Sequence, residues 1–252
     1  MNFKYWYLIV SFLFASLKVV GQEGFKKDQK RYPRVRTAYA EKEQSVKQLF
    51  DSKGISYNHF QVYLQIFKAD KKVQLWVKSG GATTYQLLKT YEICSSSGEP
   101  GPKRQQGDYQ VPEGFYFIDR FNPASSFYLS MGLNYPNQSD RILGVKGDLG
   151  GDIFIHGDCV TIGCVPLTDE WIKELYTICV EAKDKGQRRI PVTVFPAKMS
   201  GDNYQKLIKK YGSDEDKRSL WAELKTYDDL FRKYKKLPKV SFLKTGRHQV
   251  SK

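Results

Sequence analysis

Hydrophobic residues recur along the chain with two spacings, one helical and one typical of strands. In residues 29–54, which are rich in Lys, Arg, Glu and Gln, apolar residues such as Val46 and Phe50 recur on one helical face. This spacing predicts a helix that ends at the glycine at position 54. The runs 62–67 and 73–77 instead predict two strands joined as a β-hairpin. The chain is therefore expected to begin with a lead-in helix and to continue as a sheet.

Short strand candidates and a few helices make up the rest of the pattern. Loops rich in glycine and proline or in other turn-forming residues separate the strands at 95–107 and 134–140. A helix is predicted to begin after Thr168, a suitable cap that two acidic residues follow. Further strands are expected at 85–94, 115–118, 127–131, 153–156 and 190–195, and the C-terminal part offers helices at 203–211 and 219–234 and an edge strand at 240–243. This order predicts an α+β protein that is mainly β.

The first 21 residues have the composition of a secretory signal. Lys4 precedes an uncharged, largely apolar run at 5–17, and small or aliphatic residues at 19–21 precede Gln22. The run is too short to span a bilayer comfortably, which favours cleavage near position 21 over a permanent anchor, although Lys18 is unusual so close to a cleavage site. We therefore expect export to the periplasm or cell envelope, with no stable membrane anchor after cleavage.

Composition and charge narrow the class of partner. The chain is 40% hydrophobic and 27% charged, which fits a folded globular protein rather than a disordered one. Loss of Lys4 and Lys18 with the signal lowers the formal charge from +14 to +12. A balance this basic favours an anionic partner, and export excludes nucleic acid in favour of anionic lipid or an acidic cell-wall polymer. A solvated basic surface without a specific ligand is the alternative.

Candidate catalytic residues gather in the stretch 151–169. A predicted strand delivers His156 and Gly157, and Gly163 and Cys164 follow shortly before a helix. A thiol is a weak nucleophile until a base such as histidine takes its proton. Because eight positions separate the two residues, the loop must fold back, and its glycines permit such a backbone. The N–H groups of Gly163 and Cys164 are candidates to hold an oxyanion, which suits acyl transfer.

The group that orients the imidazole is not fixed by the sequence. Asp152 and Asp158 are candidates because they lie close to His156 in the chain. A backbone carbonyl would serve equally well. The sequence therefore leaves this third member of the catalytic group open.

Four cysteines in an exported chain raise the question of disulfides. If Cys164 acts as a free thiol, three cysteines remain, so at least one of Cys94, Cys159 and Cys179 stays unpaired. Cys179, on a predicted helix, is expected to be a small buried thiol. We assign no disulfide from the sequence.

Zinc binding is an alternative use of the same stretch. His156, Asp158, Cys159 and Cys164 are all residue types that ligate zinc. The sequence contains no second C-x2-C or H-x3-H pair to complete such a site. The spacing therefore favours thiol chemistry without a metal or other cofactor.

The stretch also resembles the signature of the L,D-transpeptidase catalytic domain (YkuD-like) family. That signature is histidine-glycine, then Ser or Thr, any residue, glycine and cysteine. Here it reads His156-Gly157 and Thr161-Ile162-Gly163-Cys164, and the short spacing is similar to that of the YafK-like branch. Upstream motifs agree with this branch: GPK at 101–103, GD at 107–108, PEGFY at 112–116, YPN at 135–137 and DR at 140–141.

The resemblance implies a domain organisation. It covers roughly residues 64–196, and 220–240 is similar to the C-terminal extension of the branch. The implied fold is a YkuD-like β-sandwich catalytic domain with few helices. The expected segments are a signal peptide at 1–21, a helical lead-in at 22–57, the catalytic domain at 58–198 and a helical C-terminal extension at 199–252.

The implied activity is acyl transfer on peptidoglycan stem peptides. Cys164 would form a thioester at the L-centre of meso-diaminopimelate, and His156 would move the proton. The thioester would then pass to an amine or to water. The branch slightly favours hydrolysis, including release of a wall-linked protein or lipoprotein. A non-catalytic peptidoglycan-binding module of the same fold is the alternative function, although a retired site would be free to lose His156 or Cys164.

Two departures from the wider family affect substrate binding. Many members have a longer insert and a second histidine where Ile162 stands, and an arginine where this chain has Pro166. The contact to a substrate carboxylate expected of that arginine must then come from elsewhere. The candidates for substrate binding are Lys103, Arg104, Tyr135 and Arg141, and the candidates for shaping the catalytic loop are Gly157, Thr161 and Gly163.

Overall fold

The structure is a computed structural model that describes residues 24–252, so the expected signal peptide at 1–21 lies outside the described residues. The helices are α1 (Phe25–Gln29), α2 (Pro33–Ser52), α3 (Gln138–Leu143), α4 (Asp169–Asp184), α5 (Asp202–Tyr211) and α6 (Glu215–Tyr234). The strands are β1 (Phe60–Phe67), β2 (Lys72–Ser79), β3 (Gln86–Glu92), β4 (Gly114–Asn122), β5 (Ser130–Leu133), β6 (Phe154–His156), β7 (Val165–Pro166), β8 (Ile190–Phe195), β9 (Lys239–Phe242) and β10 (His248–Ser251). The α+β class predicted from the sequence is confirmed.

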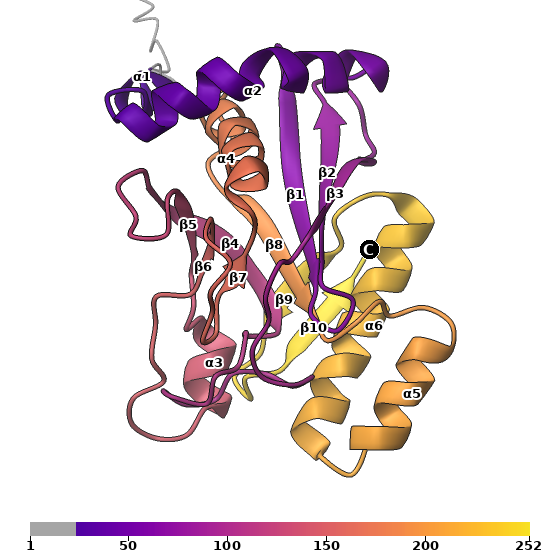
Figure 1. Cartoon of the computed structure of the whole chain (residues 1–252). Helices are drawn as coiled ribbons and strands as arrows, with labels where there is room; N and C mark the ends of the chain where they lie inside the picture. Colours follow the sequence, from indigo (N-terminus) through magenta and orange to yellow (C-terminus); the bar gives the residue numbers. More distant parts are fainter. Residues whose placement is uncertain (1–23) are drawn as a thin grey trace, which may run out of the picture.

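Eight strands form one curled sheet in the order β3-β2-β1-β8-β4-β5-β6-β7 (Figure 1). The predicted hairpin is present as β1 and β2, which pair antiparallel with Leu64 opposite Leu75. Two strand pairs are parallel, β1 with β8 and β6 with β7. The strand β1 is buried along almost its whole length because both of its faces are covered. At the other end of the sheet, β6 ends at His156 and Cys164 directly precedes β7.

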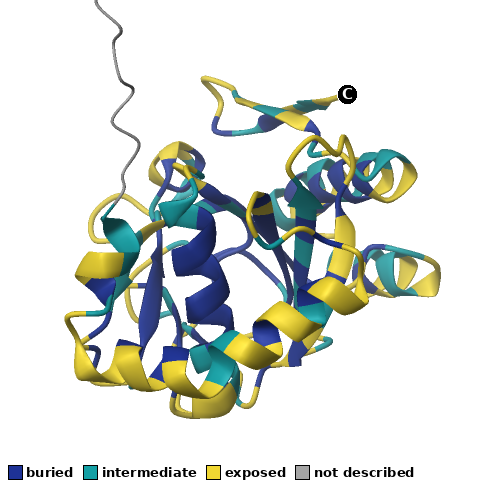
Figure 2. Cartoon of the chain, turned by 90° about the horizontal axis from the view of Figure 1, so that it is seen from above, coloured by how far each residue is buried: buried dark blue, intermediate teal, exposed yellow. Residues whose placement is uncertain are grey.

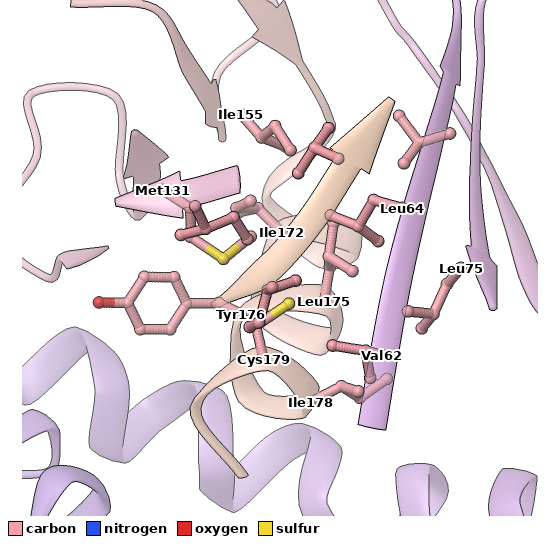
Figure 3. Close-up of a cluster of buried hydrophobic side chains, with 14 of the residues drawn as sticks. Val62, Leu64, Leu75, Met131, Ile155, Ile172, Leu175, Tyr176, Ile178 and Cys179 are labelled. Atoms are coloured by element: carbon pink, nitrogen blue, oxygen red, sulfur yellow. The ribbon is translucent and has the colours of Figure 1, made fainter. Parts of the chain in front are cut away.

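Helix α4 covers one face of the sheet and builds the larger core. Its buried side includes Ile172, Leu175 and Ile178, which lie toward Val62 and Leu64 of β1 (Figure 3). Thr168 caps this helix, as predicted, because its side chain accepts a hydrogen bond from the Trp171 N–H. The helix follows directly on β7 and so anchors the candidate catalytic loop to the core.

Helices α1 and α2 lie across the outer side of α4 (Figure 1). Helix α2 buries Val35, Ala38, Tyr39, Val46 and Phe50 against the same core, while its other face is exposed (Figure 2). It ends at Ser52, close to the predicted end. The lead-in segment therefore forms a third layer over α4.

The opposite face of the sheet is covered by the C-terminal part of the chain. Helix α6 buries Leu220, Trp221, Leu224, Tyr227 and Phe231. This stripe packs against β1, β4 and β8 side chains that point away from α4, namely Tyr63, Phe67, Phe115 and Phe195. The strands β9 and β10 form a separate antiparallel hairpin beside α6. The predicted edge strand is thus one arm of that hairpin.

The strands β7 and β10 were not predicted, and two predicted segments differ in the structure. The loop expected at 134–140 contains the start of helix α3, which begins with a capping box between Asn137 and Asp140. The strand expected at 127–131 begins only at Ser130, because Tyr128 has a left-handed backbone (φ 66°) that interrupts an extended strand. Within residues 24–252, no helix combines the length and apolar character needed to cross a bilayer.

Candidate active site

The loop between the parallel strands β6 and β7 carries the signature residues. In the β6–β7 register Ile155 lies opposite Val165 and His156 opposite Pro166. The chain therefore folds back within eight residues, as the sequence required. Gly157 is needed for space, because a Cβ there would lie 2.6 Å from Asp169 Oδ1. Gly163 is needed for its positive φ of 143°.

Thr161 holds the backbone around the nucleophile. Its Oγ1 accepts hydrogen bonds from the N–H groups of Gly163 (3.1 Å) and Cys164 (2.8 Å). The same hydroxyl donates to the Cys164 carbonyl at 2.9 Å. One side chain thus binds three backbone groups and fixes the turn that presents the thiol.

The half-buried Cys164 thiol lines a pocket between this loop and the segment 95–100. Its sulfur accepts a hydrogen bond from the Phe154 N–H at 3.4 Å and donates to the Asp152 carbonyl at 3.5 Å. Burial raises the pKa of the Cys164 thiol, while the Phe154 N–H and the positive charge of Lys103 act in the opposite direction. At neutral pH the resting group is therefore a thiol that needs a base.

His156 is buried and its ring is fixed on two sides. The ring lies 4.7 Å from the ring of Phe127, centroid to centroid. Its Nδ1 is hydrogen-bonded to the Gly157 carbonyl, so Nδ1 carries the proton and Nε2 is left as an acceptor. Burial lowers the pKa of His156, which keeps the imidazole neutral and able to take a proton.

His156 on β6 and Cys164, which directly precedes β7, lie on adjacent backbone segments. From the register, Cys164 lies at the level of Phe154, two residues along the strand from His156, which is about 7 Å. No hydrogen bond joins the two side chains in the part of the chain that the structure describes. Proton transfer requires the two side chains to approach each other, and such contacts often form only with substrate bound.

The Gly157 carbonyl, rather than Asp152 or Asp158, holds the imidazole. Asp152 instead pairs with Arg120, between Oδ1 and Nη2 at 2.9 Å. Asp158 acts on His156 only through its charge, which raises the pKa of the imidazole slightly against the larger effect of burial. The group that orients the imidazole, which the sequence left open, is therefore a backbone carbonyl.

The expected oxyanion donors are engaged in this structure. Both N–H groups, of Gly163 and Cys164, point to Thr161 Oγ1. Helix α4 begins at Asp169, so its N-terminus does not lie directly at the sulfur. An oxyanion role for these N–H groups stays a prediction that requires the Thr161 hydroxyl to share or release them.

A disulfide joins Cys94 to Cys159, although none was assigned from the sequence. The two cysteines are 65 positions apart, and nothing in their spacing shows that β3 ends beside the catalytic loop. A cysteine in a disulfide cannot ligate zinc as a thiolate. The zinc site suggested as an alternative therefore loses Cys159 as a ligand. Cys164 and Cys179 are free, and Cys179 is buried in the core as predicted.

Two of the basic residues expected to bind substrate are held in ion pairs. Lys103 is buried, with its Nζ 2.6 Å from Asp108 Oδ1 and 2.8 Å from the Gln105 carbonyl. Arg104 binds Asp216 of α6 through two hydrogen bonds, Nε to Oδ2 at 2.8 Å and Nη2 to Oδ1 at 3.1 Å. Both therefore shape the loop 95–113, and their direct contact with substrate stays a prediction.

Tyr135 and Arg141 lie away from the thiol pocket. Tyr135 is buried, precedes a cis peptide bond to Pro136 and donates from its hydroxyl to the Leu149 carbonyl at 3.0 Å. Arg141 is exposed and lines a shallow pocket with Tyr135, Gln138 and Phe242. Neither residue lines the pocket that contains Cys164.

A buried ion pair beside the pocket was not foreseen. Lys68, at the end of β1, lines the pocket and binds Glu113 Oε1 at 2.9 Å. The same carboxylate accepts the Gly101 N–H at 2.6 Å and the Trp221 Nε1–H of α6 at 2.7 Å. In the sequence, this ion pair was indicated only by the PEG motif at 112–114, which contains Glu113. This cluster connects the pocket wall to the C-terminal helices.

A family profile and a related sequence both indicate one family. The profile of the YkuD L,D-transpeptidase catalytic domain matches residues 61–194. YafK of Escherichia coli K12, whose name describes a candidate L,D-transpeptidase, is 39% identical over 193 residues, 76% of this chain and 74% of its own. Among solved structures, Pgp2, a helical cell shape determining protein of Campylobacter jejuni, has a TM-score of 0.44 with 18% identity over 73% of each chain. Bd1075 of Bdellovibrio bacteriovorus has a TM-score of 0.40 with 18% identity over 71% of this chain and 76% of its own.

Proposed function

The chain belongs to the L,D-transpeptidase catalytic-domain (YkuD) family, and on this premise we propose that it is an exported cysteine acyltransferase or hydrolase of peptidoglycan stem peptides containing meso-diaminopimelate. Membership of this family supports a peptidoglycan-related enzyme and a place in the cell envelope. One observation carries the finer proposal. Cys164 presents its thiol to a pocket, and the neighbouring strand holds a neutral imidazole whose Nε2 is free to accept a proton.

The proposed reaction begins with a proton transfer from the Cys164 thiol to His156 Nε2. The sulfur attacks the carbonyl carbon at the L-centre of the diaminopimelate, and a C–S bond forms. The C–N bond to the leaving group then breaks, and His156 gives the proton to the departing amine, which is D-alanine or an amine of a linked protein. The raised thiol pKa and the lowered imidazole pKa favour this transfer during attack rather than a resting ion pair.

The thioester has two possible fates, and the proposal includes both. An amine acceptor gives a new peptide bond, which is transpeptidation or attachment of a protein. A water acceptor gives a free carboxylate, which is carboxypeptidase action or release of a wall-linked protein. In each case His156 takes a proton from the acceptor and returns it to the departing sulfur, so the enzyme regains its starting state.

Purified protein incubated with sacculi tests this proposal, with muropeptides analysed by mass spectrometry. New 3–3 cross-links, tripeptides or freed wall protein would each identify one reaction. We expect Cys164→Ala to abolish the change and Cys179→Ala, a matched control in the core, to retain it. The proposal is overturned if Cys164→Ala alters the wall as fully as the parent. It is also overturned if the parent binds sacculi but leaves their composition unchanged, which would indicate a binding module.

A further inference from the structure

The thiol pocket contains a lysine with no acidic partner. Lys71, in the turn between β1 and β2, is exposed and lines the same pocket as Cys164. Its neighbours Lys68 and Lys72 pair with Glu113 and Glu92, whereas Lys71 forms no ion pair with any residue in 24–252. An unpaired cation in the pocket that contains the nucleophile is available to a negative charge on the substrate.

The other charged residues that line the pocket are Lys68 and Glu99, and Glu99 adds a negative charge that does not pair with Lys71. Lys68 is neutralised by Glu113, with the two groups 2.9 Å apart. Glu99 also lines the pocket, but its Oε2 accepts a hydrogen bond from the Tyr211 hydroxyl at 3.3 Å, toward α5. The pocket therefore retains an ammonium group that no neighbouring carboxylate contacts.

Ser97 supplies a second unpaired polar group in the same pocket. Its hydroxyl oxygen is shielded from solvent and has no hydrogen-bond partner among the described residues. A buried hydroxyl without a partner is unfavourable, so a site that contains one is better satisfied when an acceptor binds. A carboxylate oxygen is such an acceptor, and it suits an ammonium group equally well.

The backbone at Lys71 favours a different residue. Lys71 has a left-handed conformation with φ 51°, in a turn where its N–H donates to the Lys68 carbonyl at 3.1 Å and its carbonyl accepts from the Ile93 N–H at 2.8 Å. Glycine or asparagine adopts this conformation more readily than lysine. The turn therefore does not require lysine, and glycine at this position would remove the charge without straining the backbone.

We propose that Lys71 and Ser97 form a carboxylate-binding subsite, which holds a free carboxylate of the donor peptide beside the bond that Cys164 attacks. This inference rests on the proposed function. The family resemblance leaves the contact to a substrate carboxylate without a residue, because Pro166 stands where an arginine is expected. The subsite supplies that contact. The ligand is either the carboxylate at the D-centre of the diaminopimelate or the terminal carboxylate of the leaving D-alanine.

Turnover of three synthetic donor peptides tests the subsite and identifies the carboxylate. The parent tetrapeptide is compared with one amidated at the D-centre and one amidated at the C-terminus. Lys71→Met is expected to lower kcat/KM for the unmodified tetrapeptide at least about tenfold, which corresponds to loss of a hydrogen bond to a charged group. It should have little further effect on the one peptide whose bound carboxylate is already amidated. Lys72→Met, the paired neighbour, should behave as the parent enzyme on all three.

Two further variants separate recognition from folding. Lys71→Gly removes the charge and suits the left-handed backbone, so its Tm should equal or exceed that of the parent enzyme while kcat/KM falls as in Lys71→Met. Ser97→Ala should give a smaller loss on the same peptides. A loss of equal size on all three peptides in Lys71→Met would overturn the subsite, because the effect would not depend on a carboxylate.

Binding to the Cys164→Ala protein tests the subsite without turnover. By calorimetry, the parent tetrapeptide should bind at least about tenfold more tightly than one of the two amides, and Lys71→Met in the same background should remove this difference. If that result is found while the wild-type enzyme turns over no peptide, the subsite stands and the proposed reaction fails. If Lys71→Met leaves the affinities unchanged, the subsite fails whether or not the enzyme is active.

Discussion

The hydroxyl of Thr161 is the smallest feature on which the candidate site depends. It accepts from two N–H groups and donates to the Cys164 carbonyl, so it sets the backbone on both sides of the nucleophile. Among the described residues, Thr161 Oγ1 is the acceptor that both N–H groups use. Its position in the sequence signature therefore has a physical cause, since a Ser or Thr oxygen is needed at that spacing.

Thr161→Val should reduce both stability and activity. The valine keeps the shape but leaves two N–H groups without an acceptor, which costs about 1–3 kcal/mol for each donor that water cannot reach. We expect kcat to fall at least about tenfold, because an error of even about 1 Å in placing a catalytic group is costly. Steady-state kinetics and the rate of Cys164 alkylation by iodoacetamide measure the effect. Thr161→Ser retains the hydroxyl and should stay close to wild type, and equal losses in both variants would contradict this role.

The protonation states of His156 and Cys164 predict a bell-shaped pH profile. His156 must be neutral to accept a proton, and burial lowers its pKa, so the acid limb of kcat/KM should lie below the ordinary histidine value of about 6.5. Burial raises the Cys164 pKa, so the alkaline limb should lie above the ordinary cysteine value of about 8.5. The two apparent pKa values of this profile describe the coupled His156–Cys164 pair rather than either residue alone. An activity that rises with acidification below pH 6 would contradict the neutral pair.

The sequence proposes His156 and Cys164 as the centre of the site, and the structure places them on adjacent backbone segments, but their partners were not predictable. His156 and Cys164 follow from residue types and glycine spacing, whereas the Gly157 carbonyl that binds the imidazole carries no side-chain signal. Arg104 was expected to face substrate, yet its partner Asp216 lies 112 positions away on helix α6. Contacts of this kind depend on the fold, which a single sequence does not display.

At the scale of elements, the Cys94–Cys159 bond joins the end of β3 to the catalytic loop. Cys94 precedes the segment 95–100 that forms one wall of the thiol pocket, and Cys159 lies between His156 and Cys164. Both sides of the pocket are therefore tied together by one covalent bond. The bond also closes a loop of 65 residues, which restricts the unfolded chain.

Replacement of both cysteines, Cys94→Ser with Cys159→Ser, should lower stability and activity together. The chain-entropy relation gives a loss of about 4 kcal/mol for a loop of this length, an upper value for most proteins. Urea unfolding measures the loss, and kcat/KM on sacculi is expected to fall because the pocket wall is released. Wild-type protein reduced without denaturant should show the same direction of change. Unchanged stability and activity would show that the bond is dispensable.

Element boundaries were predictable where a strong cap or an amphipathic stripe is present. Thr168 and its two acidic neighbours mark the start of α4, and the stripe from Leu220 to Phe231 marks α6. Helix α3 was missed, although Asn137 and Asp140 form a capping box, because it is short and lies in a segment rich in turn-forming residues. Short elements are fixed by their packing rather than by their own pattern.

At the scale of the whole molecule, two cores lie on opposite faces of one sheet. Helix α4 and the lead-in helix α2 cover one face, and α5 and α6 cover the other. Alternating residues of β1 serve both cores, with Leu64 on the α4 side and Tyr63 on the α6 side. The C-terminal extension is therefore part of the packing that holds the sheet, in addition to its contact with Glu113.

Removal of residues 199–252 should prevent the sheet from folding as a soluble protein. The deletion exposes aromatic side chains of β1, β4 and β8, among them Tyr63, Phe67 and Phe195, and leaves Glu113 without the Trp221 donor. An apolar face of this kind promotes association. Soluble yield and the cooperativity of thermal unfolding check this outcome. A monomeric, cooperatively folded 22–198 fragment would show that the extension is an independent unit.

Intact-protein mass spectrometry of a trapped thioester is the most direct test of the central claim. The protein is mixed with a tetrapeptide containing meso-diaminopimelate, quenched in acid within the first turnovers and mapped by proteolysis. The account predicts a mass increase equal to the donor peptide less its leaving group, on Cys164 alone, removed by hydroxylamine and missing from Cys164→Ala. Turnover by Cys164→Ala, or an acyl group on any other residue, would contradict it.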